Sequence, residues 1–150
     1  MGERAVPDGR RVRIRVLPEV GRRRMKEENR AERAEKRARF RDQELEAAEA
    51  ILRRIGELTD VERERGRFSI REGRYQTSQY NAYAVFEEGL RGAVEARRSC
   101  AKLTAAERLA LHGAVAMTRY SDGWHFERLV RLFAKGMIDL EKAKIGRAHV

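Results

Sequence analysis

The chain of 150 residues is poor in several residue types, and each shortage excludes a class of structure or location. Cys100 is the only cysteine, so no disulfide can form within the chain, and we expect a reducing, cytoplasmic location. No apolar run approaches the roughly 18 residues that a membrane-spanning helix needs, so we expect no membrane association. The basic N-terminus is not followed by the apolar segment of a secretory signal.

Residues that could carry catalysis or bind a metal are scarce and scattered. Cys100 follows two arginines, and His112 is expected to be a hydrogen-bonded histidine of the core. Neither the Cys-x-x-Cys nor the His-x-x-x-His spacing of metal sites occurs. Gly89 and Gly92 fall inside a predicted helix and not in the strand–loop–helix context of a phosphate site. We therefore expect a protein that is not an enzyme, without a cofactor and without a metal site.

Charge is abundant and unevenly placed. Lysine and arginine number 34 against 24 acidic residues, a net charge of +10. Residues 1–41 hold 15 basic and 7 acidic residues, and residues 42–150 hold 19 and 17. Nearly all of the excess is therefore in the first third of the chain. Arginine outnumbers lysine 28 to 6, as codon bias in a GC-rich genome would produce, so only the placement of the basic residues is informative.

The N-terminal segment, residues 1–21, is expected to be a basic arm that is either strand-like or disordered. Residues 10–17 read RRVRIRVL, and this alternation of β-branched and basic residues is typical of a strand. Pro18 ends the pattern because proline donates no ladder hydrogen bond. The sequence offers residues 67–75 as the strand's partner, which would make a small β-ribbon.

Residues 22–58 predict one long charged helix. Proline and glycine are absent between Arg22 and Ile55, and helix-forming residues dominate. A heptad stripe runs along it, weak and alanine-rich in front and strong behind, at Leu45, Leu52 and Ile55. The strong part must be buried, either by docking on the rest of the chain or by a coiled-coil contact with a partner helix.

Residues 59–144 predict a helical body. A helix capped by Thr77 or Ser78 is expected to run to about Lys102, and a capping box at Thr104 and Glu107 begins the next. A third begins near Asp122. With residues 45–58 these helices make a mainly α fold, a bundle of about four helices with short antiparallel connections. The expected inward side chains are Tyr83, Phe86, Leu90, Val94, Ala101, Phe126, Val130, Phe133, Met137 and Leu140.

The last six residues, 145–150, read IGRAHV, which looks like the in-frame translation of a short-read sequencing adapter. We expect this segment to be an artefact and the natural protein to continue beyond Lys144. It is therefore left out of functional reasoning.

Two functions remain open. Basic side chains cluster on both sides of Pro18. Because such clusters can neutralise phosphates without sequence specificity, they favour a non-enzymatic accessory protein bound to a DNA or RNA backbone. The expected contacts are Arg10, Arg11, Arg13, Arg15, Arg22, Arg23, Arg24 and Lys26. Beyond Arg30 acidic residues nearly balance the basic ones, and no known DNA- or RNA-binding signature is present. The alternative is a protein–protein adaptor or homo-oligomer that binds a helical partner through Leu45, Leu52 and Ile55.

Overall fold

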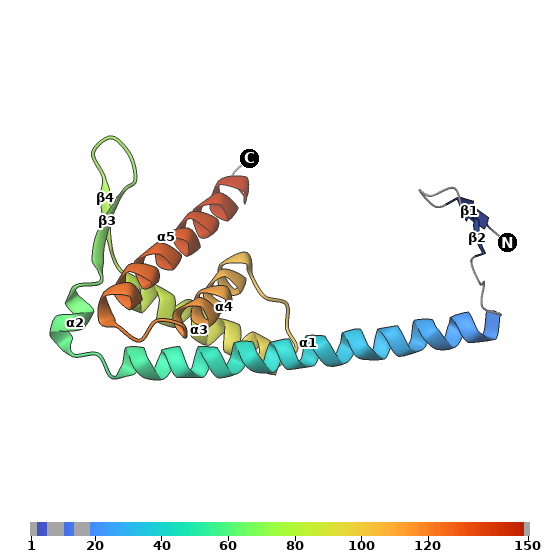
Figure 1. The fold of residues 1–150 in the computed structure, drawn as a ribbon. Helices are drawn as coiled ribbons and strands as arrows, with labels where there is room; N and C mark the ends of the chain where they lie inside the picture. Colours follow the sequence, from blue (N-terminus) through green and yellow to red (C-terminus); the bar gives the residue numbers. More distant parts are fainter. Residues whose placement is uncertain (1–2, 6–10, 14–18, 149–150) are drawn as a thin grey trace. The chain divides into compact units, whose positions relative to one another are not determined.

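The computed structural model describes the backbone of residues 3–5, 11–13 and 19–148 and the side chains of residues 21–143 (Figure 1). Helix makes up 75% of it, which confirms the mainly α fold. The elements in chain order are β1 (Glu3–Ala5), β2 (Arg11–Arg13), α1 (Glu19–Gly56), α2 (Asp60–Glu64), β3 (Arg67–Arg71), β4 (Thr77–Asn81), α3 (Ala82–Arg98), α4 (Ala105–Met117) and α5 (Gly123–Ala148).

The chain forms two compact units, Met1–Arg39 and Phe40–Val150, and helix α1 contributes to both. In the first unit β1 and β2 pair in an antiparallel sheet, with Glu3 opposite Arg13. The strand expected at residues 10–17 therefore pairs with β1 and not with residues 67–75, and its residues 14–17 lie outside the described part of the chain. Helix α1 begins at Glu19, three residues before the expected start.

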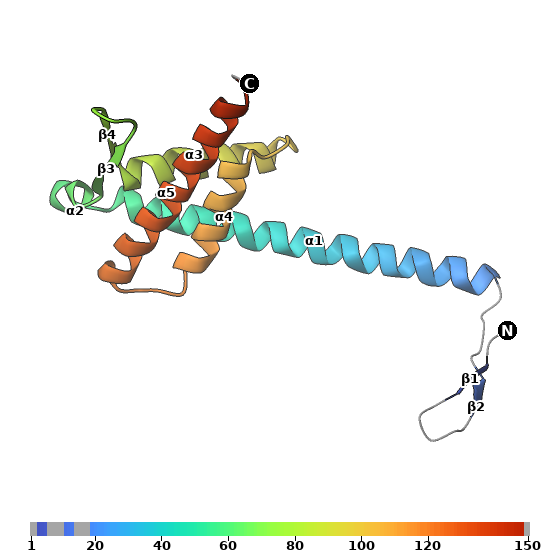
Figure 2. The ribbon, with the colours of Figure 1, turned by 90° about the horizontal axis from the view of Figure 1, so that it is seen from above.

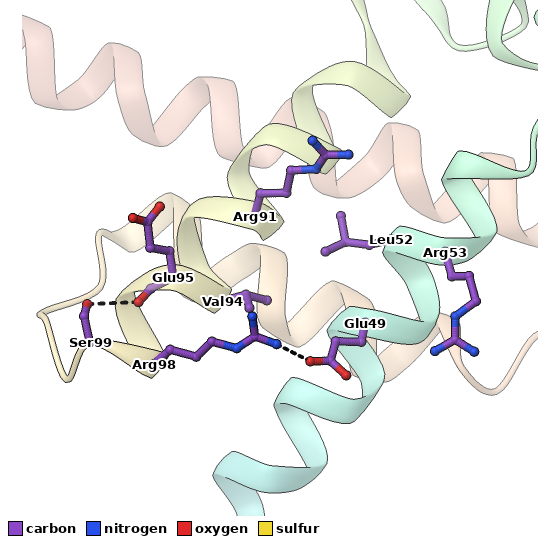
Figure 3. A pocket seen from close by; sticks show the side chains of 8 residues that line it. All are labelled: Glu49, Leu52, Arg53, Arg91, Val94, Glu95, Arg98 and Ser99. Carbon is purple, nitrogen blue, oxygen red and sulfur yellow. Dashed lines mark hydrogen bonds and ion pairs between the residues drawn. The ribbon is translucent and has the colours of Figure 1, made fainter.

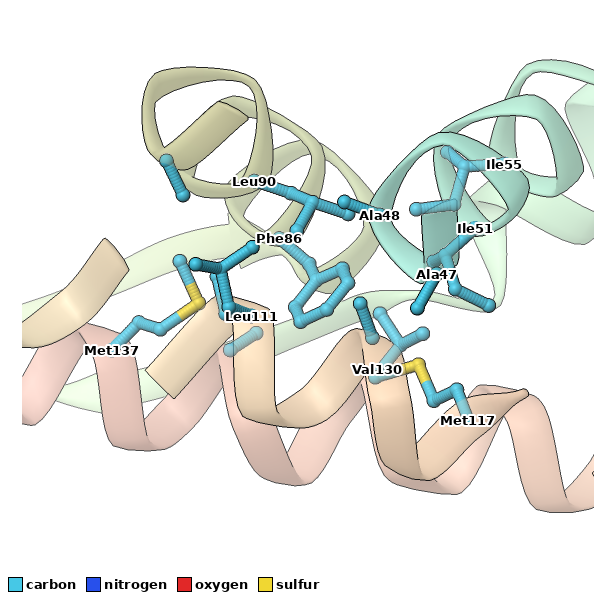
Figure 4. Close-up of a cluster of buried hydrophobic side chains, with 14 of the residues drawn as sticks. Ala47, Ala48, Ile51, Ile55, Phe86, Leu90, Leu111, Met117, Val130 and Met137 are labelled. Carbon is cyan, nitrogen blue, oxygen red and sulfur yellow. The ribbon is translucent and has the colours of Figure 1, made fainter. Parts of the chain in front are cut away.

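The second unit is a helical body around one apolar core. Helices α3, α4 and α5 pack against one another, and the C-terminal part of α1 closes the bundle (Figures 1 and 2). Phe86 of α3 lies fully buried at its centre, facing α4, α5 and α1 (Figure 4). The fully or nearly fully buried side chains around it are Ala48, Ile51, Ile55, Leu90, Leu111, Met117, Phe126 and Val130. The expected four-helix body is therefore present.

Glycines let the helices of the body approach closely. A Cβ on Gly113 of α4 would lie 2.8 Å from Cγ of Phe133 and 3.0 Å from Cε2 of Phe86. A Cβ on Gly89 of α3 would collide with the end of Met137. A larger residue at Gly113 would displace two aromatic rings of a close-packed core, whereas at Gly89 only the flexible end of Met137 would have to move.

Capping boxes begin two of the helices, one of them the box predicted at Thr104 and Glu107. The backbone N–H of Glu107 donates to Oγ1 of Thr104 at 3.1 Å, and the N–H of Thr104 donates back to the Glu107 carboxylate at 2.8 Å. Thr59 and Glu62 make the same exchange at the start of α2. Each box satisfies two donors that a helix start would otherwise leave unpaired.

The start of α3 differs from the expectation. Residues 77–81 form strand β4, which pairs with β3, and the helix begins at Ala82, three or four residues later than expected. Asn81 caps it, because its side-chain oxygen accepts hydrogen bonds from the N–H groups of Tyr83 and Ala84. An asparagine is as good a cap as serine or threonine, and it leaves the preceding residues free to pair as a strand.

The end of α3 and the surface of α4 also differ. Helix α3 stops at Arg98, and Cys100 follows with a φ of 56°, the left-handed conformation that closes many helices. Ala101 is therefore exposed and not part of the core. His112, expected to be buried, is exposed, because α4 has one solvent-facing side that also carries Arg108.

Candidate nucleic-acid interface

A row of basic side chains follows one side of helix α1 within the first unit. We define the basic stripe as Arg22, Lys26, Arg30, Arg33 and Arg37. Their steps of three and four residues keep all five within an arc of about 80° around the helix axis, over a length of about 22 Å. Every one of these side chains is exposed.

The acidic residues of the same segment lie outside this arc, with Glu27 at its flank and the other three on the far side of the helix. At 100° per residue, Glu27, Glu28, Glu32 and Glu35 all fall at least about 100° from the centre of the stripe. Arg24 and Arg39 lie among these acids. Residues 22–39 hold nine basic and four acidic side chains, and the acids are separated from the stripe around the helix axis.

The stripe is not neutralised by its neighbours on the helix. In the described part of the chain no ion pair within 4.0 Å involves Arg22, Lys26, Arg30, Arg33 or Arg37. The Nε of Arg33 donates to the backbone carbonyl of Asn29 at 3.2 Å, which orients that side chain along the helix and leaves its charge uncompensated. Such a row can neutralise the evenly spaced charges of a phosphate backbone.

The predicted contact residues divide into four pairs. Arg10 and Arg15 lie outside the described residues, and Arg11 and Arg13 belong to β2, where only the backbone is described. Arg22 and Lys26 belong to the basic stripe. Arg23 and Arg24 are exposed on α1 but lie outside the arc of the stripe.

Arg30, Arg33 and Arg37 also repeat at steps of three and four residues in the sequence, but the acids near them favour a solvated helix face over a contact site. Counting charge by angle around the helix, and not by position along it, separates these arginines from the acids.

The predicted partner-binding residues lie in the core of the second unit. Ile55 is completely buried, and Leu45 and Leu52 are half-buried against the same apolar cluster. Since Ile55 is covered by this chain itself, it is not available to a partner. The strong part of the heptad stripe docks on the body.

A groove runs between α1 and α3 in the second unit, with a volume of about 630 Å³ (Figure 3). Leu52 and Val94 form its apolar floor, and charged residues of both signs surround them. The guanidinium of Arg98 is paired with the carboxylate of Glu49, so the basic rim is partly neutralised. The remaining lining residues are Arg53, Arg91, Glu95 and Ser99. This mixture favours no particular ligand.

An aromatic cluster lies where α4 connects to α5. The rings of Tyr120 and His125 stack at 5.2 Å, and Trp124 meets the His125 ring edge-on at 4.9 Å. Asp122 caps α5, and its hydrogen bonds with the His125 side chain and backbone hold the pKa of that carboxyl below its ordinary value of 3.8. The histidine ring is thus held by a carboxylate that the helix already uses as a cap.

Apolar side chains are exposed further along α5. Trp124 and Leu132 are 62% and 64% exposed and lie on one side of the helix, eight residues apart. Arg128 lies between them, with its guanidinium 5.5 Å from the Trp124 ring. Trp124 is the largest exposed apolar side chain on the described helices of the body, and Leu132 extends the same side of α5.

The described chain thus contains a mainly α bundle with the β3–β4 ribbon and, in the first unit, a helix segment with a basic stripe. Comparison with known protein families, curated proteins and solved structures finds no match for this chain. Among the described residues, no three His, Cys, Asp or Glu side chains are grouped so that they could hold a metal ion. No helix in the same residues combines the length and the apolar character needed to cross a bilayer.

Proposed function

We propose that the protein is a non-enzymatic accessory protein that binds nucleic acid through the basic stripe of helix α1. The single observation that supports this proposal is the separation of charge around the helix, with five exposed cations within one arc and the acids outside it. In this proposal the protein acts in the cytoplasm, where Cys100 remains a thiol.

The stripe suits a phosphate backbone in both length and charge. Five cations over about 22 Å can each neutralise one phosphate and release its condensed counterion. For B-DNA this gives a slope of about −4.5 in a plot of log affinity against log salt concentration. Binding should therefore weaken roughly 500-fold between 50 mM and 200 mM salt.

The test compares two double variants with the same change in charge. Arg30→Gln with Arg37→Gln removes two members of the stripe, and Arg24→Gln with Arg39→Gln removes two arginines on the acidic side. Affinity for two unrelated DNA duplexes is measured by fluorescence anisotropy at several salt concentrations. The stripe variant should reduce the slope by about 2, and the control variant should leave it nearly unchanged.

Equal effects of the two double variants would contradict the proposal, because they would show a response to net charge and not to the stripe. Helical content by circular dichroism should be the same in all three proteins, since glutamine and arginine have similar helix propensities.

The second candidate is an adaptor that binds a partner helix through the exposed side of α5. Trp124 and Leu132 are two turns apart with Arg128 between them, so the fitting partner is an amphipathic helix with carboxylates between two apolar anchors.

The only tryptophan of the chain reports directly on this contact. A helical peptide with two leucines eight residues apart and glutamates between them should shift the Trp124 emission to shorter wavelength, and Leu132→Glu should abolish the shift. The same peptide with lysines in place of the glutamates is the control. A shift that depends on the concentration of the protein alone would instead indicate a second copy of this chain as the partner.

A further inference from the structure

The β3–β4 hairpin has two chemically different faces. The register places Arg67 opposite Asn81, Ser69 opposite Gln79 and Arg71 opposite Thr77, all on one side. Of these six, five side chains are exposed, and we define them as the outer ribbon face: Arg67, Ser69, Arg71, Thr77 and Gln79. The face contains two arginines, two hydroxyls, one amide and no carboxylate.

The other face attaches the hairpin to the body. Phe68 and Tyr80 lie opposite each other with ring centroids 5.7 Å apart, and Nζ of Lys135 from α5 lies 5.6 Å from the Phe68 ring. The carboxylate of Glu72 accepts hydrogen bonds from the Tyr80 hydroxyl at 3.0 Å and from Nζ of Lys142 at 2.7 Å. The hairpin's one acidic side chain is thus held by groups on the inner face and on α5.

The outer ribbon face and the tip keep their polar groups available. Ser69, Thr77 and Gln79 make no side-chain hydrogen bond within the described part of the chain. Arg71 makes one long bond, 3.4 Å, to the carbonyl of Arg74, whereas Arg67 is paired with Glu64 at 3.0 Å. At the tip the Tyr75 side chain is 90% exposed.

We propose that this ribbon enters the major groove of duplex DNA and reads base edges with Arg71 and Gln79. The inference rests on the proposed function and deepens it. The proposed function supplies contacts to phosphates, and the ribbon would supply contacts to bases. A two-stranded ribbon fits a groove about 12 Å wide. Arginine can bind the O6 and N7 atoms of guanine in a bidentate way, and glutamine the N6 and N7 atoms of adenine.

The shape and charge of the ribbon favour a DNA duplex over other nucleic acids. The major groove of A-form RNA is deep and narrow, so side chains on a ribbon cannot reach its bases. A single strand would be bound mainly by stacking on aromatic rings, and Tyr75 is the only aromatic ring of the ribbon that is largely exposed. The outer ribbon face offers hydrogen-bonding groups, which match base edges.

The experiment begins with selection of 20-base-pair duplexes from a random pool by the full chain at moderate salt. A preferred sequence should emerge, and its affinity is then compared with that of a scrambled duplex. Gln79→Ala does not change the charge and should weaken binding to the preferred duplex by about 10-fold, with no change for the scrambled one. Arg71→Ala should also weaken binding to the preferred duplex by about 10-fold. Because it removes a positive charge, it should in addition slightly weaken binding to the scrambled duplex.

Arg108→Ala is the matched control for the loss of charge, because this exposed arginine lies on α4 and away from the hairpin. It should leave the ratio of the two affinities unchanged. All three substitutions are at exposed positions, so the melting temperature should stay within a few degrees of the original. This control keeps a loss of folding apart from a loss of recognition.

The outcomes separate the inference from the proposed function. Binding to duplexes without any enriched sequence, or an equal loss for both duplexes in Gln79→Ala, overturns the inference and leaves the basic stripe as the contact. A preference for single strands that Tyr75→Ala removes also overturns it. No binding to any nucleic acid overturns both proposals.

Discussion

Replacing Arg54 with alanine removes the contact by which helix α1 holds the connection between α4 and α5. The guanidinium donates to the backbone carbonyls of Tyr120, Ser121 and Asp122 at 2.7, 2.9 and 3.2 Å. It also lies over the ring of Phe126, 3.9 Å from the centroid. One side chain therefore fixes three consecutive carbonyls and covers an aromatic ring of the core.

The size of the effect follows from these contacts. Two of the hydrogen bonds are short, and a hydrogen bond to a charged group contributes about 1.5–3 kcal/mol. The cation–π contact adds about 0.5–1 kcal/mol. The three carbonyls lie in an exposed connection, so water replaces the lost donors and reduces the net cost. We expect Arg54→Ala to lower the free energy of unfolding by about 2 kcal/mol, and the melting temperature by about 4–8 °C.

Arg53 supplies the matched control, because it is the neighbouring residue on the helix, is exposed, and makes no side-chain hydrogen bond or ion pair in the described structure. Both proteins are unfolded with urea and monitored by circular dichroism. Arg53→Ala should change the free energy of unfolding by less than about 0.5 kcal/mol. If the two variants are equally stable, Arg54 does not hold the connection and the reasoning is refuted.

Three further predictions concern the core, a helix end and the hairpin. Gly113→Ala should destabilise the body by about 1–3 kcal/mol in urea unfolding, whereas Gly73→Ala, with open space around it, should change little. Cys100→Gly should raise the free energy of unfolding by about 1 kcal/mol, because glycine adopts the left-handed conformation without strain, and Cys100→Ala should not. Hydrogen bonds from Lys142 and Tyr80 hold the pKa of Glu72 below its ordinary value of 4.5, so the carboxylate stabilises the hairpin at any pH above 4.5 and loses this effect as the pH falls through the lowered pKa. Amide chemical shifts of residues 67–81 should therefore change as the pH falls through this lowered pKa in the original protein and not in Glu72→Gln.

Much of the body follows from local patterns in the sequence. The capping box at Thr104 and the apolar spacing of Phe86, Leu90 and Val94 predict α4 and the inner face of α3 correctly. These signals are read within one or two helical turns, where side-chain chemistry alone decides the outcome. The β3–β4 hairpin is harder to predict from the sequence, because its second strand begins with Thr77, which is equally suited to cap a helix. Only the pairing with β3 distinguishes the two.

Strand β2 shows a related difficulty, since the alternation in residues 10–17 predicts a strand but not its partner. The partner, Glu3–Ala5, has three residues and no alternation of its own. Pairing is a property of two segments, and a short edge strand carries too few residues to be recognised alone.

The candidate interface shows that composition along α1 does not reveal how its charges are arranged around the helix axis. Along the sequence Glu27, Glu28, Glu32 and Glu35 alternate with six basic residues between positions 27 and 41, so this part of the helix reads as a spacer with mixed charge. Around the helix axis the same acids lie outside a continuous row of cations. An approaching phosphate responds to the charges within about one Debye length, roughly 10 Å at 0.1 M salt, and so responds mainly to the face it meets. Under the proposed function, the acids would lower the net charge and its attraction for anions in general and would leave the stripe as the favoured contact. For that reason, substitution of the acids by glutamine should strengthen binding to any duplex, but only moderately, whereas substitution within the stripe should change the salt dependence itself.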